Sequence, residues 1–384
     1  MMKIFSMLQT RPNSRGFTRF TQFRFILTFA FLIIFLTTPN LSAHASSNDE
    51  AGAVKWHPGH YFTLMGGKNN PQYLSQVYRE LESTPALRGV QIRYEWIDLE
   101  PSEGAYDFSQ IEQRLRELSE RKKRLIVLLQ IKSFDASTRF IPDYLKDKKY
   151  EDGAFPFSSY GKQKIRGYNL KLWNTQLQNR LVALITELGK RFNTHPYFEG
   201  IGLTETAMGN PMIELSKNQE NSFYSGMLLI NQELRKHFPN TMTYQFTNYP
   251  RPMLKSFVNR LREIGTGLGG PDTFPDDPGL TANKANSPKG VYHHYPELSG
   301  IVPLTPSVMQ ANYANTRHDN SGKVPTIEEL LAFARDNLKA NYIFWTRAPG
   351  HFPRVLQTLR SLPADSPAGG LITVCPRAYH SCVE

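Results

Sequence analysis

Cysteine is nearly missing from this sequence of 384 residues, since only Cys375 and Cys382 occur, both near its end. Two cysteines exclude a small disulfide-stapled scaffold, which needs several bridges in a short chain. If the chain reaches an oxidising compartment, we expect the two thiols to pair and close a short C-terminal loop. The alternative is a pair of buried thiols.

Acidic residues are missing from the first 45 positions, where five basic residues precede an apolar run at 25–36 and the stretch Ser42-Ala43-His44-Ala45. A basic start, a short apolar run and a small-residue site form, in this order, a secretory signal. The run is shorter than the roughly 20 residues of a membrane span, although a permanent anchor is the alternative. We therefore predict a signal peptide over residues 1–45, cleavage after Ala45, no stable membrane span afterwards, and a periplasmic or secreted protein.

The charge of the chain is only mildly basic once that segment is set aside. The full sequence has 45 Lys and Arg against 34 Asp and Glu, and without the five basic residues of the signal the balance is 40 − 34 = +6. An excess of this size needs no nucleic-acid partner. A loose attraction to acidic polymers of a cell envelope is compatible with it.

Several catalytic motifs are also missing. The sequence has no G-x-S-x-G elbow, no P-loop and no dinucleotide-binding fingerprint in a strand-turn-helix context. The usual signals of serine hydrolases, kinases and dehydrogenases are therefore absent. We find no internal repeat, low-complexity tract or linker after Lys55, so residues 46–384 are predicted to form one domain with a C-terminal tail.

What the sequence does contain is an alternation of short β-branched or aromatic runs with longer amphipathic stretches, which is typical of βα units around a parallel sheet. The count of strands is eight, the number that closes a (β/α)8 TIM barrel of the α/β class. The predicted strands are His60–Met65, Gly89–Trp96, Arg124–Ile131, Gly200–Thr206, Met242–Asn248, Thr266–Asp272, Ser307–Tyr313 and Asn341–Trp345.

Amphipathic helices are expected between the strands, with apolar residues at i, i+3, i+4 and i+7. They are Pro71–Ser83, Phe108–Lys122, Leu170–Asn193, Glu220–His237, Arg251–Ile264, Thr326–Ala340 and Phe352–Leu362. Thr326 and Glu329 form a predicted capping box. Two segments, Asp135–Asn169 and Asp272–Thr305, interrupt the rhythm and are predicted to be long loops. Both follow strands, so in a barrel they lie on the catalytic face.

The strongest candidate catalytic residue is Glu205, which ends the fourth predicted strand. A side chain at the carboxyl end of a barrel strand faces the pocket of this fold. On the second strand, Arg93 is expected to point into the same cavity, where a fixed cation can keep a carboxylate ionised.

Two motifs carry a family resemblance. A strand with Arg93 and Trp96 leads into an "EPxxGxYDF" turn that begins at Glu100, and a long helix later ends in "HPYFEGIGLTE". Together they resemble the retaining glycoside hydrolases of clan A, such as cellulases and bacterial β-galactosidases, over about residues 55–362. The resemblance implies a general acid/base Glu at the end of the fourth strand, usually after Asn, and a nucleophile Glu at the end of the seventh. Glu205 matches the first position, with Thr204 in place of Asn.

The resemblance also implies that Trp345, at the end of the eighth strand, forms the floor on which a sugar ring stacks. The seventh strand departs from the pattern, because Gln310 stands where the nucleophile is expected and an amide cannot form the glycosyl ester. Asp272, after the sixth strand, is the leading candidate for the second carboxylate, and it could equally be a turn residue. Glu95 is a third candidate, on the face of Arg93.

Other polar side chains fall at or just beyond strand ends and are candidates for hydrogen bonds to sugar hydroxyls. We expect about half of them only to support strands and loops. They are Gln130, Asn248, Tyr249, Asn312, Tyr313 and Arg347, with His294 from a Tyr-rich loop.

The sequence therefore predicts a monomeric, secreted glycoside hydrolase that acts on a poly- or oligosaccharide. Its predicted catalytic acids are Glu205 and Asp272, and it needs no metal and no organic cofactor. The alternative, favoured by Gln310, is a non-catalytic barrel that binds a glycan of the envelope or matrix.

Overall fold

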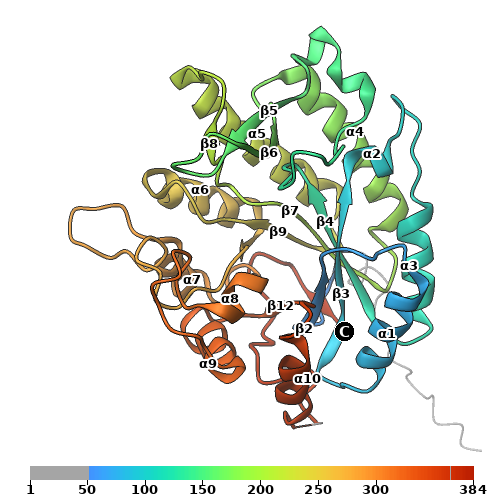
Figure 1. The fold of residues 1–384 in the computed structure, drawn as a ribbon. Coiled ribbons are helices and arrows are strands. Elements are labelled where there is room, and N and C mark those ends of the chain that lie inside the picture. Colours follow the sequence, from blue (N-terminus) through green and yellow to red (C-terminus); the bar gives the residue numbers. More distant parts are fainter. Residues whose placement is uncertain (1–51, 364) are drawn as a thin grey trace, which may run out of the picture. The chain divides into compact units, whose positions relative to one another are not determined.

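The computed structural model describes residues 52–363 and 365–384, so the predicted signal sequence lies outside the described residues. Its centre is a closed barrel of eight parallel strands, in the order β10-β11-β12-β2-β3-β4-β7-β9 (Figure 1). The predicted (β/α)8 fold is therefore confirmed. The barrel strands are β2 (Gly59–Leu64), β3 (Leu87–Glu95), β4 (Arg124–Gln130), β7 (Phe198–Leu203), β9 (Met242–Phe246), β10 (Gly267–Gly270), β11 (Leu304–Val308) and β12 (Tyr342–Thr346).

Helices surround the strands, as Figure 1 shows, and several begin at a residue whose side chain caps the helix. Ser216 and Gln219 form a capping box on α5, and the predicted box of Thr326 and Glu329 is confirmed on α9. The longer helices are α1 (Pro71–Glu82), α3 (Ser109–Ser119), α4 (Thr175–Phe192), α5 (Lys217–His237), α6 (Arg251–Ile264), α9 (Ile327–Ala332) and α10 (Phe352–Arg360). Short helices are α2 (Trp96–Leu99), α7 (His294–Leu298) and α8 (Gln310–Ala314).

The two faces of the barrel wall bury different sets of side chains, because successive residues of a strand point to opposite faces. Tyr61, Tyr244 and Phe344 belong to one buried cluster, and Phe62 and Ile343, their neighbours in the chain, belong to the larger cluster that includes the helices. The first cluster fills the barrel interior with aromatic rings. The barrel interior is therefore a packed core, and a ligand can bind only at an end of the barrel.

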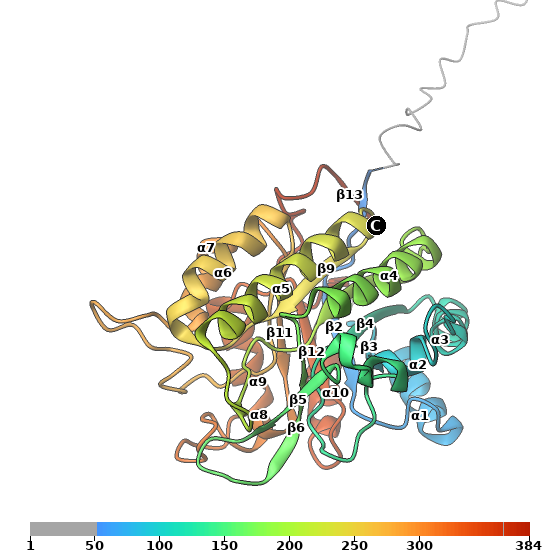
Figure 2. The ribbon, with the colours of Figure 1, turned by 90° about the horizontal axis from the view of Figure 1, so that it is seen from above.

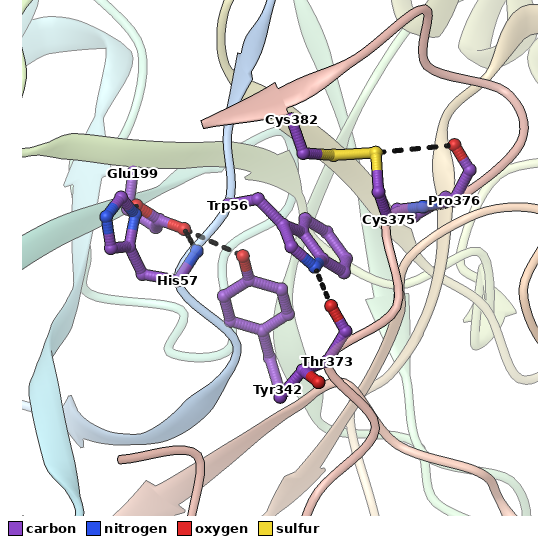
Figure 3. The surroundings of a disulfide bond; sticks show 8 residues. All are labelled: Trp56, His57, Glu199, Tyr342, Thr373, Cys375, Pro376 and Cys382. Carbon is purple, nitrogen blue, oxygen red and sulfur yellow. Dashed lines mark hydrogen bonds and ion pairs between the residues drawn. A yellow bond between two sulfur atoms is a disulfide. The ribbon is translucent and has the colours of Figure 1, made fainter. Parts of the chain in front are cut away.

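The amino-terminal end of the barrel is sealed by the two ends of the described chain. Strand β1 (Val54–Lys55) pairs in parallel with β13 (Cys382–Val383), side by side in Figure 2. The disulfide between Cys375 and Cys382, which was predicted, closes the tail beside this pair. Figure 3 shows Trp56 next to the bridge, where its indole Nε1 donates to the Thr373 carbonyl over 2.8 Å.

A buried carboxylate holds the same end together from inside. Glu199 is fully buried and accepts hydrogen bonds from the main-chain N–H of His57 and from the Tyr342 hydroxyl, both over 2.7 Å (Figure 3). Burial opposes its ionisation, but the hydrogen bonds and charges of His57 and Arg124 lower its pKa. Glu199, in the "HPYFEG" motif, is therefore a structural residue.

The "EPxxGxYDF" motif also has a structural role. Glu100 is fully buried and accepts from the Trp96 indole and the Gly104 N–H, each over 2.8 Å. Tyr144 and Arg180 bind the same carboxylate. Glu100 thus ties α2, the turn after it, the long segment after β4 and α4 into one unit.

Three predictions about irregular segments need correction. Asp135–Asn169 contains the hairpin β5 (Ala154–Ser158) and β6 (Ile165–Leu170), which joins β8 (Asn210–Pro211) in a separate sheet of order β6-β5-β8. Asp272–Thr305 contains α7 and a 3₁₀ turn. The seventh strand begins three residues earlier than predicted and ends at Val308 instead of Tyr313, so that Gln310 begins helix α8.

Candidate active site

Glu205 lies two residues beyond the end of β7, at the carboxyl-terminal mouth of the barrel. Its Oε1 is 2.7 Å from the Lys132 Nζ, and its Oε2 accepts from the Asn248 side-chain amide over 3.3 Å. The Glu205 side chain is 15% exposed and that of Lys132 is 3% exposed. The carboxylate is therefore held by a buried cation and by the predicted Asn248, and still reaches solvent.

Lys132 itself is fixed by the segment that follows β4. Its Nζ also donates to the Ala207 carbonyl, and it lies over the rings of Phe134 and Phe157, at 5.1 and 4.3 Å from their centroids. Sequence reasoning missed Lys132. The signal was its spacing, because Lys132 stands two residues after the predicted Gln130 and so shares its face of the strand.

Asp272 lies two residues beyond the end of β10. Its Oδ1 accepts only a long bond, 3.5 Å, from the side-chain amide of Asn312, and its main-chain carbonyl accepts from the Tyr292 hydroxyl. Burial of the carboxyl and the negative charge of Glu205 raise the pKa of Asp272 to about 7. The two acids therefore interact electrostatically, and Asp272 can hold a proton near neutral pH.

A second acid supports the loop that carries Asp272. Asp277 is fully buried and accepts from the N–H groups of Gly279 and Leu280, from the exposed His318 and, over 3.5 Å, from the Tyr249 hydroxyl. Although burial opposes it, the hydrogen bonds from His318, Leu280 and Gly279 lower the pKa of Asp277. Tyr249, a predicted sugar contact, directs its hydroxyl at Asp277.

Arg93 and Glu95 line a hollow of about 390 Å³ at this mouth, together with Lys68, Gln130 and Phe134. Glu95 accepts from Gln130 over 2.7 Å and pairs with Lys68 at 2.6 Å. Burial lowers the pKa of Arg93, while the charge of Glu205 raises it, followed by weaker effects that include Glu95 and Asp272. The structure thus brings Arg93, Glu95, Glu205, Asn248 and Asp272 together.

The prediction that Trp345 forms a sugar-stacking floor is wrong. Its neighbour Phe344 points into the barrel, so Trp345 points outward, where it is fully buried against the helices and its indole donates to His60 over 3.0 Å. The prediction for Tyr313 is wrong for a similar reason. It is fully buried, stacks on His351 and donates to the Thr346 carbonyl over 3.0 Å.

Three other predicted sugar contacts are not placed to make them. Arg347 is 7% exposed, and its guanidinium forms a two-bond pair with Glu80 of α1, at 2.7 and 2.8 Å. His294 is 6% exposed within α7, where burial lowers its pKa. Gln310 is exposed at the start of α8 instead of ending a strand.

Over residues 52–363 and 365–384 the structure offers neither a metal-binding cluster nor a membrane-spanning helix. In this part of the chain, no group of three or more His, Cys, Asp or Glu side chains is arranged to hold a metal ion. No helix in the same part is both long and apolar enough to cross a bilayer.

Comparison with solved structures finds the same fold in a β-amylase, a β-galactosidase and an endo-glycoceramidase. The catalytic domain of β-amylase from Paenibacillus polymyxa has a TM-score of 0.55 at 9% identity, over 80% of this chain and 99% of that domain. A β-galactosidase from Bacillus circulans sp. alkalophilus has a TM-score of 0.51 at 12% identity, over 77% of this chain and 51% of its own, so this chain spans about half of that enzyme. Endo-glycoceramidase II from Rhodococcus sp. has a TM-score of 0.50 at 14% identity, over 78% and 76%.

No family model matches the sequence. No curated protein matches it either. The similarity to solved structures thus shows the barrel fold that the resemblance implied.

Proposed function

We propose that this protein is an exported glycoside hydrolase that cleaves O-glycosidic bonds in a poly- or oligosaccharide with the carboxyl groups of Glu205 and Asp272. The observation that carries the proposal is a pair of interacting acids from the ends of β7 and β10, held in unlike surroundings at the mouth of the barrel. Two carboxyl groups in unlike surroundings can serve as a proton donor and its ionised partner, which is what glycoside hydrolysis needs.

The surroundings of the two carboxyl groups support one assignment of their roles. Glu205 pairs with the buried Lys132 and accepts from Asn248, and both contacts stabilise its ionised form. Asp272 has no cation at ion-pair distance among the described residues, and its pKa of about 7 leaves it protonated in a large fraction of molecules at neutral pH. Asp272 is then the proton donor and Glu205 the ionised partner, the reverse of the role that the family resemblance implies for Glu205.

The reaction follows from these roles. The bond between the anomeric carbon and the glycosidic oxygen breaks, and the departing oxygen takes its proton from Asp272. The electron pair that the anomeric carbon gains comes from the Glu205 carboxylate, or from a water oxygen whose proton Glu205 accepts. In the first case, water then hydrolyses the glycosyl ester and returns the proton to Asp272. The anomeric configuration of the first product, read by NMR, distinguishes the two courses.

The test compares substrates that need a proton donor with substrates that do not. Wild-type protein is expected to release reducing ends from one member of a glycan panel. The Asp272→Asn variant should release them about 10²–10⁴-fold more slowly. On the dinitrophenyl glycoside of the same sugar, whose leaving group needs no proton, Asp272→Asn should stay within about tenfold of wild type. Glu205→Gln should be inactive on both substrates.

Two results would contradict parts of this proposal. If Glu205→Gln keeps activity on the dinitrophenyl glycoside and Asp272→Asn does not, the roles are exchanged. If the wild type binds glycans of the panel and cleaves none, the non-catalytic glycan-binding barrel is correct, a second candidate that the lack of an acid after β11 favours. Export is tested separately, because the N-terminus of the exported protein should be Ser46.

A further inference from the structure

The end of β3 presents a cation with unused hydrogen-bonding capacity. The Arg93 Nε is buried and has no hydrogen-bond partner, and within the described residues its guanidinium forms no ion pair. The group lies over the Phe134 ring, 5.6 Å from its centroid. A guanidinium carries five donors in a rigid fork and stays protonated in proteins, so leaving it unmatched out of water is costly.

The other charged groups around the hollow already have partners. Lys68 pairs with Glu95 at 2.6 Å and with Asp98 at 2.7 Å, and Lys132 pairs with Glu205 at 2.7 Å. The exposed Asp135 accepts from the N–H and hydroxyl of Ser137. Among the charged side chains that line the hollow, Arg93 is therefore the one without an ion-pair or hydrogen-bond partner in the described residues.

The hollow that Arg93 lines has the volume of a small-ligand site. Its volume is about 390 Å³, within the range of roughly 300–1,000 Å³ that ligand pockets occupy. Ser133 and Thr138 add hydroxyl groups to its wall, and Gly66 and Gly67 bring main chain to its edge. The hollow lies at the ends of β2, β3 and β4, and Arg93 in its wall also feels the charges of Glu205 and Asp272, which do not themselves line it.

We propose that this hollow binds the carboxylate of a uronic-acid unit, with the Arg93 guanidinium as the principal donor, so that the substrate is an acidic glycan. A planar carboxylate matches the guanidinium fork with two parallel hydrogen bonds, which a sugar hydroxyl cannot do. The balance of 40 basic to 34 acidic residues after position 45 agrees with an anionic polymer. The inference rests on the proposed function for placing the sugar chain beside Glu205 and Asp272.

The test measures binding without turnover. Calorimetry with the Glu205→Gln protein compares oligosaccharides of galacturonate, mannuronate and glucuronate with their carboxyl-reduced, neutral counterparts. One uronate series should bind at least tenfold more tightly than its neutral counterpart. Arg93→Gln in the same background should remove that preference, and Arg93→Lys, which keeps the charge without the fork, should retain part of it.

A matched control separates the site from the overall charge. Lys217→Gln removes one positive charge at an exposed position on α5, and it should leave the preference unchanged. The melting temperature of each variant verifies that the barrel is intact.

Four results overturn the inference: equal binding of acidic and neutral glycans, no binding of any uronate, a preference that survives Arg93→Gln, or a stronger preference for sulfated neutral glycans at the same residue. Uronate binding through Arg93 without cleavage by the wild type would instead leave this site in place and contradict the proposed hydrolysis. The two proposals therefore fail in distinguishable ways.

Discussion

At the scale of single residues, the site contains two carboxylic acids that share the same functional group but have different neighbours. Glu205 faces Lys132, and Asp272 faces a distant amide and the charge of Glu205. The residue types of Glu205 and Asp272 alone do not predict these neighbours. A carboxyl group whose ionised form is poorly stabilised is also a cost to the fold, and this cost depends on pH.

Asp272→Asn is therefore expected to stabilise the protein at alkaline pH. The raised pKa means that folded Asp272 stays protonated up to about pH 7, while the unfolded side chain ionises near pH 4. Its contribution to stability is present below pH 4 and is lost as the pH rises to 7. Urea unfolding should find the variant more stable than wild type by up to about 4 kcal/mol at pH 8, and about equal at pH 4. The exposed Asp276→Asn is the control, and a difference that does not change with pH would contradict the argument.

At the scale of elements, most of the architecture could be predicted because most barrel strands are distinct apolar runs. The predicted position of β11 is wrong because Pro306 lies within the strand and weakens its pattern. Tyr313, which belongs to α8, extends the apolar pattern beyond the end of the strand. Predicting which face of a strand a residue occupies is harder, since a shift of one residue reverses it. This reversal explains the error at Trp345. Lys132 was missed because its partners Glu205 and Ala207 lie 73 and 75 residues away in the sequence.

Strand β7 also depends on a glycine that the sequence did not single out. A Cβ at Gly202 would overlap the Tyr244 ring of β9, which fills the barrel at this level. Gly202→Ala is expected to lower the free energy of unfolding by about 1–3 kcal/mol and to reduce activity, because it displaces the strand that leads to Glu205. Gly66→Ala, with no atom within 4 Å of the added Cβ, is the control. Equal urea midpoints for the two variants would rule out this close packing.

At the scale of the whole barrel, the disulfide closes a loop between residues seven positions apart, next to the β1–β13 pair. A loop of this length should contribute about 2 kcal/mol through the reduced entropy of the unfolded chain. The double variant Cys375→Ser/Cys382→Ser is expected to unfold at correspondingly lower urea, and wild type under reducing conditions should match it. A wild type that is as stable reduced as oxidised would show that β13 packs without the bridge.

The pairing of β1 with β13 has a consequence for how this chain can be rearranged. Because Val54 and Cys382 are register partners, the two ends of the described chain lie within a short peptide of each other. A short linker would join these ends, and new ends would open at the exposed Tyr160, in the turn between β5 and β6. In this circular permutant every barrel strand would keep its present order around the barrel.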